Sequence, residues 1–172
     1  PSSICNRERS ARLDPKELIV MVISDDQIKN LIYKSCRLLD AEEFDDYLDL
    51  YTEDFEYKVT NYSREIRKDQ EWMDVNREEL KGLLGNVPLH FHLLGSFMRH
   101  ATVYDIERNG SDKAYALTYV TIYYTTPEGA TSVWAVGRYH DVIDVSGETP
   151  LIADRNMKLE TREVGIGTHL PM

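Results

Sequence analysis

The chain has 172 residues, which is enough for about one domain with a sizeable core. Its net charge is −10, with 20 Lys and Arg against 30 Asp and Glu, and an acidic chain lacks the basic surface that grips nucleic acid or an anionic membrane. Hydrophobic residues make up 42% of the sequence, too many for a disordered protein. We therefore expect a globular protein that binds neither nucleic acid nor membrane.

The sequence contains two cysteines, Cys5 and Cys36. Two thiols are too few for a disulfide framework, a four-thiolate zinc site or an iron–sulfur cluster held by this chain alone. The longest apolar run, Leu18–Ile23, is too short to cross a bilayer, and no signal peptide is visible. The sequence thus predicts free thiols in a cytoplasmic protein.

The first part of the chain is predicted to be helical. Residues 1–13 are polar and basic and are expected to form a flexible arm ahead of one domain over residues 14–172. Asp14-Pro15 is a typical helix start, and Ser24-Asp25-Asp26-Gln27 is a capping box that begins a second helix. A third helix is expected to begin at Asp40, and its apolar face would carry Phe44, Tyr47, Leu48 and Tyr51.

Strands follow, interrupted once. After a turn at Thr52–Asp54 we expect a strand over Phe55–Tyr62 and then a helix over Asp69–Leu84 that Gly85 ends. From His90 onward, long strands are joined by short turns, which favours an antiparallel sheet. The expected strands are His90–Glu107, Lys113–Thr126, Thr131–Val145 and Leu151–Val164.

Glycines inside two of these long strands, Gly95 and Gly137, indicate bulges or bends. Long, bent strands form a curved sheet that must pack around other elements, and the N-terminal helices are available to fill its concave side. The predicted fold class is therefore α+β: a cone-like, curved antiparallel sheet wrapped around N-terminal helices, as in cystatin-like folds.

The strand that begins at Lys113 has no water-loving face. One face carries Ala114, Ala116, Val120 and Ile122, and we expect it to pack on the helices. The other face carries Tyr115, Leu117, Tyr119 and Tyr123. We interpret Tyr115, Tyr119 and Tyr123 as a subunit interface. The alternative is that a long loop or the C-terminal tail covers this face.

His90 and His92 are the most suggestive local feature for chemistry. On a strand they point to the same face, and with Asp46 or Glu43 they would form a two-His-one-carboxylate iron site. The alternative is that backbone carbonyls satisfy both imidazoles. His140 and Asp141 are adjacent on a strand, so they face opposite ways and cannot form a simple dyad.

An acid–base pocket inside the cone is a further alternative, suited to a dehydratase or isomerase. It would combine a helix carboxylate, a strand histidine and tyrosine hydroxyls. The carboxylates are also explained more simply as a solvated helix face. The candidates are Asp45, Asp46, Asp49, His90, His92, Tyr57, Tyr62 and Tyr139.

Four stretches in order resemble the small (β) subunit of bacterial aromatic-ring-hydroxylating dioxygenases, within the nuclear-transport-factor-like, cystatin-like superfamily. The resemblance covers residues 24–172. The tail from Gly165 differs from the hydrocarbon-dioxygenase branch and is similar to members that act on aromatic acids. The four stretches are Leu39–Asp54, His92–Ser96, Gly137–Asp141 and Lys158–Arg162.

This resemblance implies a division of labour. A large (α) subunit would carry the Rieske [2Fe–2S] cluster and the mononuclear iron, and the β subunit would be mainly structural, with self-association in a hexamer of three α and three β subunits. A Rieske cluster needs two Cys and two His in close pairs. Cys5 and Cys36 have no His nearby in the sequence, so we expect no cofactor and no catalytic residue in this chain.

Overall fold

The computed structural model describes residues 22–87, 95–110, 112–164 and 171–172. The expected flexible arm, the helix start at Asp14-Pro15 and the pair His90 and His92 lie outside the described residues, as does most of the tail from Gly165. Those expectations remain predictions.

The capping box confirms the start of the longest helix. Helix α1 (Asp25–Asp40) has Ser24 as N-cap, and its hydroxyl accepts a hydrogen bond from the backbone N–H of Gln27 while the Gln27 side chain accepts from the backbone N–H of Ser24. Its apolar side is buried. The third predicted helix, α2 (Phe44–Leu48), begins later and ends earlier than expected. Asp40 is the last residue of α1, and Tyr51 already belongs to the first strand.

Two predictions in the middle of the chain are wrong. The expected turn at Thr52–Asp54 lies inside strand β1 (Tyr51–Ser63). The predicted helix over Asp69–Leu84 is divided into an edge strand, β2 (Lys68–Asn76), and a helix, α3 (Arg77–Asn86), which continues through Gly85. β2 is a strand because it pairs with β1, and its polar side chains contribute little to the core.

The second half forms four strands as expected, but the last one ends at Leu159 and not at the predicted Val164. They are β3 (Ser96–Asn109), β4 (Lys113–Thr125), β5 (Thr131–Asp144) and β6 (Leu151–Leu159), and consecutive strands pair antiparallel. In the described residues the strand order is β2-β1-β6-β5-β4-β3. The sheet is not wholly antiparallel, because β1 pairs with β6 in parallel. Otherwise the predicted α+β class with a curved sheet is confirmed.

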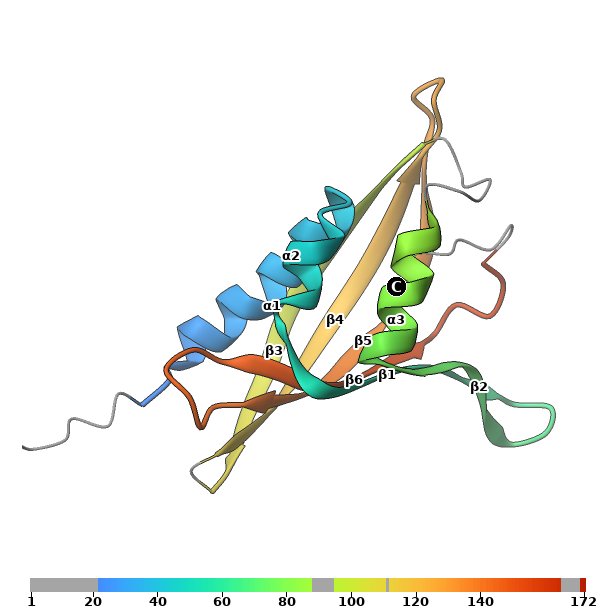
Figure 1. The fold of residues 1–172 in the computed structure, drawn as a ribbon. Helices are drawn as coiled ribbons and strands as arrows, with labels where there is room; N and C mark the ends of the chain where they lie inside the picture. Colours follow the sequence, from blue (N-terminus) through green and yellow to red (C-terminus); the bar gives the residue numbers. More distant parts are fainter. Residues whose placement is uncertain (1–21, 88–94, 111, 165–170) are drawn as a thin grey trace, which may run out of the picture.

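The sheet bends across its long strands, and the helices lie against its inner side (Figure 1). Register shifts in β1, β3, β4 and β5 interrupt the pairing and help the sheet to curve. At Gly137 the neighbouring strand comes so close that a Cβ atom would lie 2.5 Å from the carbonyl oxygen of Lys158. The core between helices and sheet includes Ile28, Leu38, Leu80, Ile122, Ile143 and Met157.

Candidate functional site

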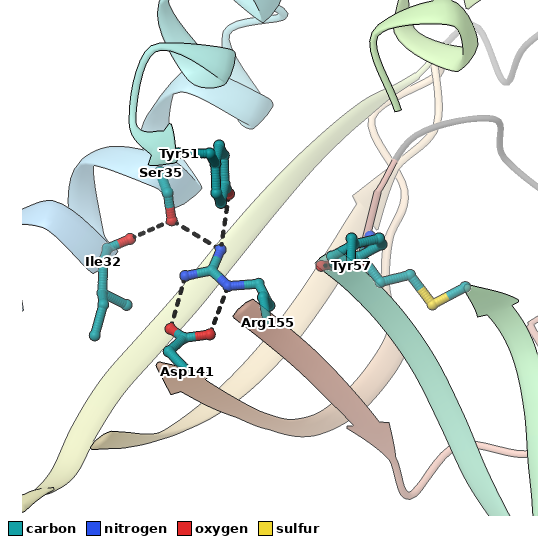
Figure 2. Close-up of polar contacts among 7 residues, drawn as sticks. Ile32, Ser35, Tyr51, Tyr57, Asp141 and Arg155 are labelled. Carbon is teal, nitrogen blue, oxygen red and sulfur yellow. Dashed lines mark hydrogen bonds and ion pairs between the residues drawn. The ribbon is translucent and has the colours of Figure 1, made fainter. Parts of the chain in front are cut away.

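The centre of the cone is occupied by a buried ion pair between β5 and β6 (Figure 2). The guanidinium of Arg155 donates two hydrogen bonds to the carboxylate of Asp141, both at 2.8 Å, and neither side chain has any exposed surface. Its remaining terminal nitrogen donates to the hydroxyls of Ser35 (3.0 Å) and Tyr51 (3.3 Å). Four hydrogen bonds to three partners therefore fix this guanidinium.

The electrostatics of this pair favour the charged state. Burial alone would lower the pKa of Arg155, but the facing Asp141 carboxylate outweighs burial and holds that pKa well above its usual value. The guanidinium also lies over the ring of Tyr139, 4.2 Å from its centroid. Asp141 is thus committed to Arg155 and is not a free general base.

A second buried arginine ties the first long strand to helix α1. Arg99 donates from its side chain to Asp40 (2.5 Å), and its backbone N–H donates to the same carboxylate (2.8 Å). Its other terminal nitrogen donates to the backbone carbonyl of Pro171 (2.5 Å). Tyr57 binds Met172, the residue that follows Pro171. The Tyr57 hydroxyl donates to the carbonyl oxygen of Met172 (3.0 Å) and accepts from the Met172 N–H (2.9 Å).

The buried tyrosines of the cone hold their protons. Burial is the largest influence on Tyr47, Tyr51, Tyr57 and Tyr139, and it raises the pKa of each phenol above the usual value. A phenol with a raised pKa is a poor base at neutral pH. Burial likewise raises the pKa of the Cys36 thiol, which makes this cysteine unreactive.

The candidates for acid–base chemistry are not brought together. Asp45, Asp46 and Asp49 are exposed on α2 and at its end, as expected of a solvated helix face. Of the described histidines, His100 and His140 are exposed, and His140 points away from its buried neighbour Asp141. Tyr62 is also exposed, whereas Tyr57 and Tyr139 are fully buried. Within the described ranges, the cone interior therefore contains no histidine–carboxylate pair.

The outer face of the sheet, which points away from the helices, carries exposed aromatic side chains. Alternation along β4 is as predicted: Ala114, Ala116, Val120 and Ile122 are buried against the core, whereas Tyr115 and Tyr119 remain 41% and 44% exposed. Tyr123 lies on the same outer face and is partly exposed.

Aromatic and basic side chains cluster around Tyr119. Its ring lies 4.4 Å, centroid to centroid, from that of Tyr104, and the Arg138 guanidinium lies 5.2 Å from its centroid. Tyr123 packs its ring edge-on against His100 at 5.2 Å. We call this exposed cluster on β3, β4 and β5 the tyrosine face, and its members are Tyr104, Tyr115, Tyr119, Tyr123, His100 and Arg138.

A shallow hollow of about 420 Å³ adjoins the tyrosine face where β4, β5 and β6 cross the outer side of the sheet. Tyr115 and His140 line it together with the carboxylates of Asp105, Glu107 and Asp154. Partial burial, followed by the neighbouring Glu56 carboxylate, raises the pKa of Asp154. Burial, then Lys158 and Arg138, lowers the pKa of His140.

Neither metal ligands nor a membrane span is found in the part of the chain that the structure describes. Those residues include no group of three or more His, Cys, Asp or Glu side chains placed to hold a metal ion. None of the described helices is long and apolar enough to cross a membrane. Cys36, buried and without a nearby histidine in the sequence, does not fit the Cys₂His₂ donor set of a Rieske cluster.

Comparison with known proteins identifies the family. A family model described as a SnoaL-like domain matches residues 21–154, so the chain belongs to the SnoaL-like domain family. The chain is 28% identical over 145 residues to the 2-aminobenzenesulfonate 2,3-dioxygenase subunit beta of Alcaligenes sp, covering 84% of this chain and 97% of that one. It is 26% identical over 156 residues to the methanesulfonate monooxygenase hydroxylase subunit beta of Methylosulfonomonas methylovora, covering 86% of each.

Solved structures show the same fold. The beta subunit of benzoate 1,2-dioxygenase from Burkholderia mallei superposes with a TM-score of 0.66 at 19% identity, covering 87% of this chain and 98% of that one. ActVI-ORFA from Streptomyces coelicolor superposes with a TM-score of 0.61 at 15% identity, covering 78% and 96%. The resemblance to oxygenase β subunits that the sequence predicts is confirmed, since both curated relatives carry that description.

The two buried arginines were not predicted from the sequence. Arg155 stands at an inward position of β6, and Asp141 stands at the facing inward position of β5, two opposite charges on faces that are otherwise apolar. Such a pair of inward charges on neighbouring strands is the signal that could have identified the ion pair. Arg99 offers a weaker signal, because its partners come from α1 and from Pro171, far away in the sequence.

Proposed function

We propose that this chain is the β subunit of a multi-subunit, Rieske-type ring-hydroxylating oxygenase of the cytoplasm, and that its role is assembly and support. The observation that carries the proposal is the buried Arg155–Asp141 pair, which ties up the buried carboxylate of the cone interior and leaves it unavailable for acid–base chemistry. The β-subunit relatives, matched over nearly their whole length, support the same role.

The iron centres then belong to a large α subunit. The two cysteines of this chain do not provide the ligands of a Rieske cluster, so the electrons and the oxygen chemistry need a partner. The proposed assembly has three α and three β subunits. Because the two curated relatives are named for an aromatic and an aliphatic sulfonate, we propose a small organic acid, aromatic in the first instance, as the compound oxidised.

Co-expression with the large subunit tests this function. We expect a stable hetero-oligomer that oxidises an aromatic acid such as benzenesulfonate or benzoate, whereas this chain purified alone is colourless and holds no stoichiometric iron. Asp46→Ala in the complex keeps its turnover, because the Asp46 carboxylate is exposed on α2. Loss of a general acid or base usually lowers the turnover rate by ~100-fold or more. If the Asp46→Ala complex assembles but its turnover rate falls by that factor, the dehydratase or isomerase alternative is supported instead.

The tyrosine face is the proposed assembly surface, with Tyr115, Tyr119 and Tyr123 at the interface. Tyrosine and arginine are enriched in interface hot spots, and Tyr119 combines a neighbouring tyrosine ring with a stacked arginine. Tyr119 points away from the buried apolar face of β4, so a change at Tyr119 leaves the core intact.

Tyr119→Lys tests the surface, because a contact would have to bury an unpaired ammonium. We expect weaker assembly with the large subunit in sedimentation or size exclusion, with an unchanged circular dichroism spectrum. Tyr33→Lys is the matched control: Tyr33 is 40% exposed, but it lies on α1, on the other side of the sheet. Normal assembly of Tyr119→Lys, or equal losses in both variants, contradicts an interface on this face.

A further inference from the structure

The last two residues of the sequence are held inside the mouth of the cone by side chains from distant strands. Pro171 is buried, and Met172 is half-buried against the core. In Figure 1 the C mark overlies helix α3. The contacts are made through the backbone of the segment: Arg99 of β3 binds the Pro171 carbonyl, and Tyr57 of β1 binds both the carbonyl and the N–H of Met172.

Polar atoms of the cone are left without partners close to this segment. The Nε of Arg99 and the hydroxyl of Tyr139 are buried and have no hydrogen-bond partner among the described residues. Burial raises the pKa of Tyr57 and of Tyr139, and the charge of Arg99 partly offsets that rise for both phenols. Buried donors without partners are costly, and in native proteins they commonly mark a place for water or a ligand.

We propose that the cone retains a small-molecule site, and that Pro171–Met172 fills it as an internal ligand. The segment presents carbonyl oxygens to a guanidinium and a phenol, and it offers an apolar side chain to the core. The site would take a short apolar molecule that carries an amide or carboxylate group, with its oxygens on Arg99 and Tyr57. Release of the segment opens the site, and binding in trans competes with the segment.

The donors and acceptors decide this ligand class. Arg99 is already neutralised by Asp40, so a ligand needs an acceptor oxygen but no full negative charge. The Tyr57 hydroxyl accepts from the Met172 N–H and donates to the Met172 carbonyl oxygen, so it matches a ligand that carries an amide N–H beside an acceptor oxygen. Such a ligand is therefore expected to bind more tightly than a simple carboxylate, which has the acceptor oxygen alone.

The first experiment ends the chain after residue 170 and measures its melting temperature with and without added acetyl-Pro-Met amide. We expect the shortened chain to melt several degrees lower than the intact chain and to regain stability as the dipeptide is added, since a ligand that binds only the folded state raises stability with its concentration. The intact chain shows no shift, because its site is filled. Hexanoate, which has acceptor oxygens but no N–H for the Tyr57 hydroxyl, should give a smaller shift.

A shortened chain that melts like the intact one, or that gains nothing from the dipeptide, overturns the proposal. If the shortened chain does not fold, the Tyr57→Phe variant of the intact chain is measured in its place. This variant keeps the ring and removes the hydroxyl that accepts from the Met172 N–H. We expect hydrogen exchange at the Met172 amide to become at least tenfold faster, whereas the control Tyr47→Phe leaves it unchanged. Unchanged protection in Tyr57→Phe refutes the internal ligand.

Discussion

Replacing Arg155 with Met should destabilise the protein by about 3–5 kcal/mol, because it leaves the Asp141 carboxylate charged and unpaired in the core. The structure supports a value in this range. Both side chains are fully buried, and the change removes two charge-assisted hydrogen bonds of 2.8 Å along with those to Ser35 and Tyr51. For a domain of this size, such a loss corresponds to a fall in melting temperature of roughly 10 °C.

The assay is urea unfolding followed by circular dichroism, with two companion variants. Arg138→Met removes a partly exposed partner of Glu160, and a surface pair of this kind contributes less than about 1 kcal/mol. The double variant Asp141→Leu with Arg155→Met removes both charges of this pair and strands neither, so we expect it to be more stable than Arg155→Met alone.

Two results would refute this reasoning. A loss below about 1 kcal/mol in Arg155→Met means that the pair is not desolvated as the structure shows. A double variant less stable than Arg155→Met means that the hydrogen-bond geometry, and not the stranded charge, dominates the loss.

Two further changes test the packing of the strands and the charges on the outer face. Gly137→Ala should lower the free energy of unfolding by about 2 kcal/mol or more, because the new Cβ would lie 2.5 Å from the Lys158 carbonyl oxygen. Gly82→Ala on α3 meets no atom within 4 Å and should raise that free energy by up to about 1 kcal/mol. Thermal melts measure both changes. Asp154→Asn should stabilise the isolated chain at neutral pH. Burial and the Glu56 carboxylate raise the pKa of Asp154 in the folded protein above its ordinary value of 3.8. The ionised Asp154 therefore lowers the stability of the folded state as the pH rises above 3.8, and asparagine removes this loss. The advantage of Asp154→Asn should shrink as pH falls towards 3.8, and an advantage that is constant with pH would contradict this cause.

Local signals in the sequence predicted the elements that depend on neighbouring residues. The capping box at Ser24 fixed the start of α1, and alternation in β4 identified which residues face the core. The capping box Asn76-Arg77-Glu78-Glu79 was also visible, and it would have corrected the predicted helix over Asp69–Leu84 by placing its start at residue 77.

Features that depend on distant contacts could not be predicted in the same way. The residues of β2 are mostly charged or polar and show no clear alternation, and they form a strand only because β1 pairs with them. The contacts of Arg99 with Asp40 and Pro171 join segments separated by 59 and 72 residues. No local pattern contains that information, so the interior of the candidate site came from the structure and not from the sequence.

The parallel pairing of β1 with β6 also determines the order in which the protein can fold. Short connections join the four strands from β3 to β6, so each strand can pair with the previous one as soon as it is synthesised. β1 joins this part of the sheet only through β6, which follows about 100 residues later in the sequence. The Asn61 side chain, for example, donates to the Leu159 carbonyl across 98 residues. Until Leu151–Leu159 has been synthesised, β1 and β2 can pair with each other but not with the rest of the sheet. High contact order of this kind slows folding and prolongs the exposure of apolar strands. We therefore expect β1 to dock late, onto a preformed hairpin of β5 and β6 in which Asp141 and Arg155 already face each other.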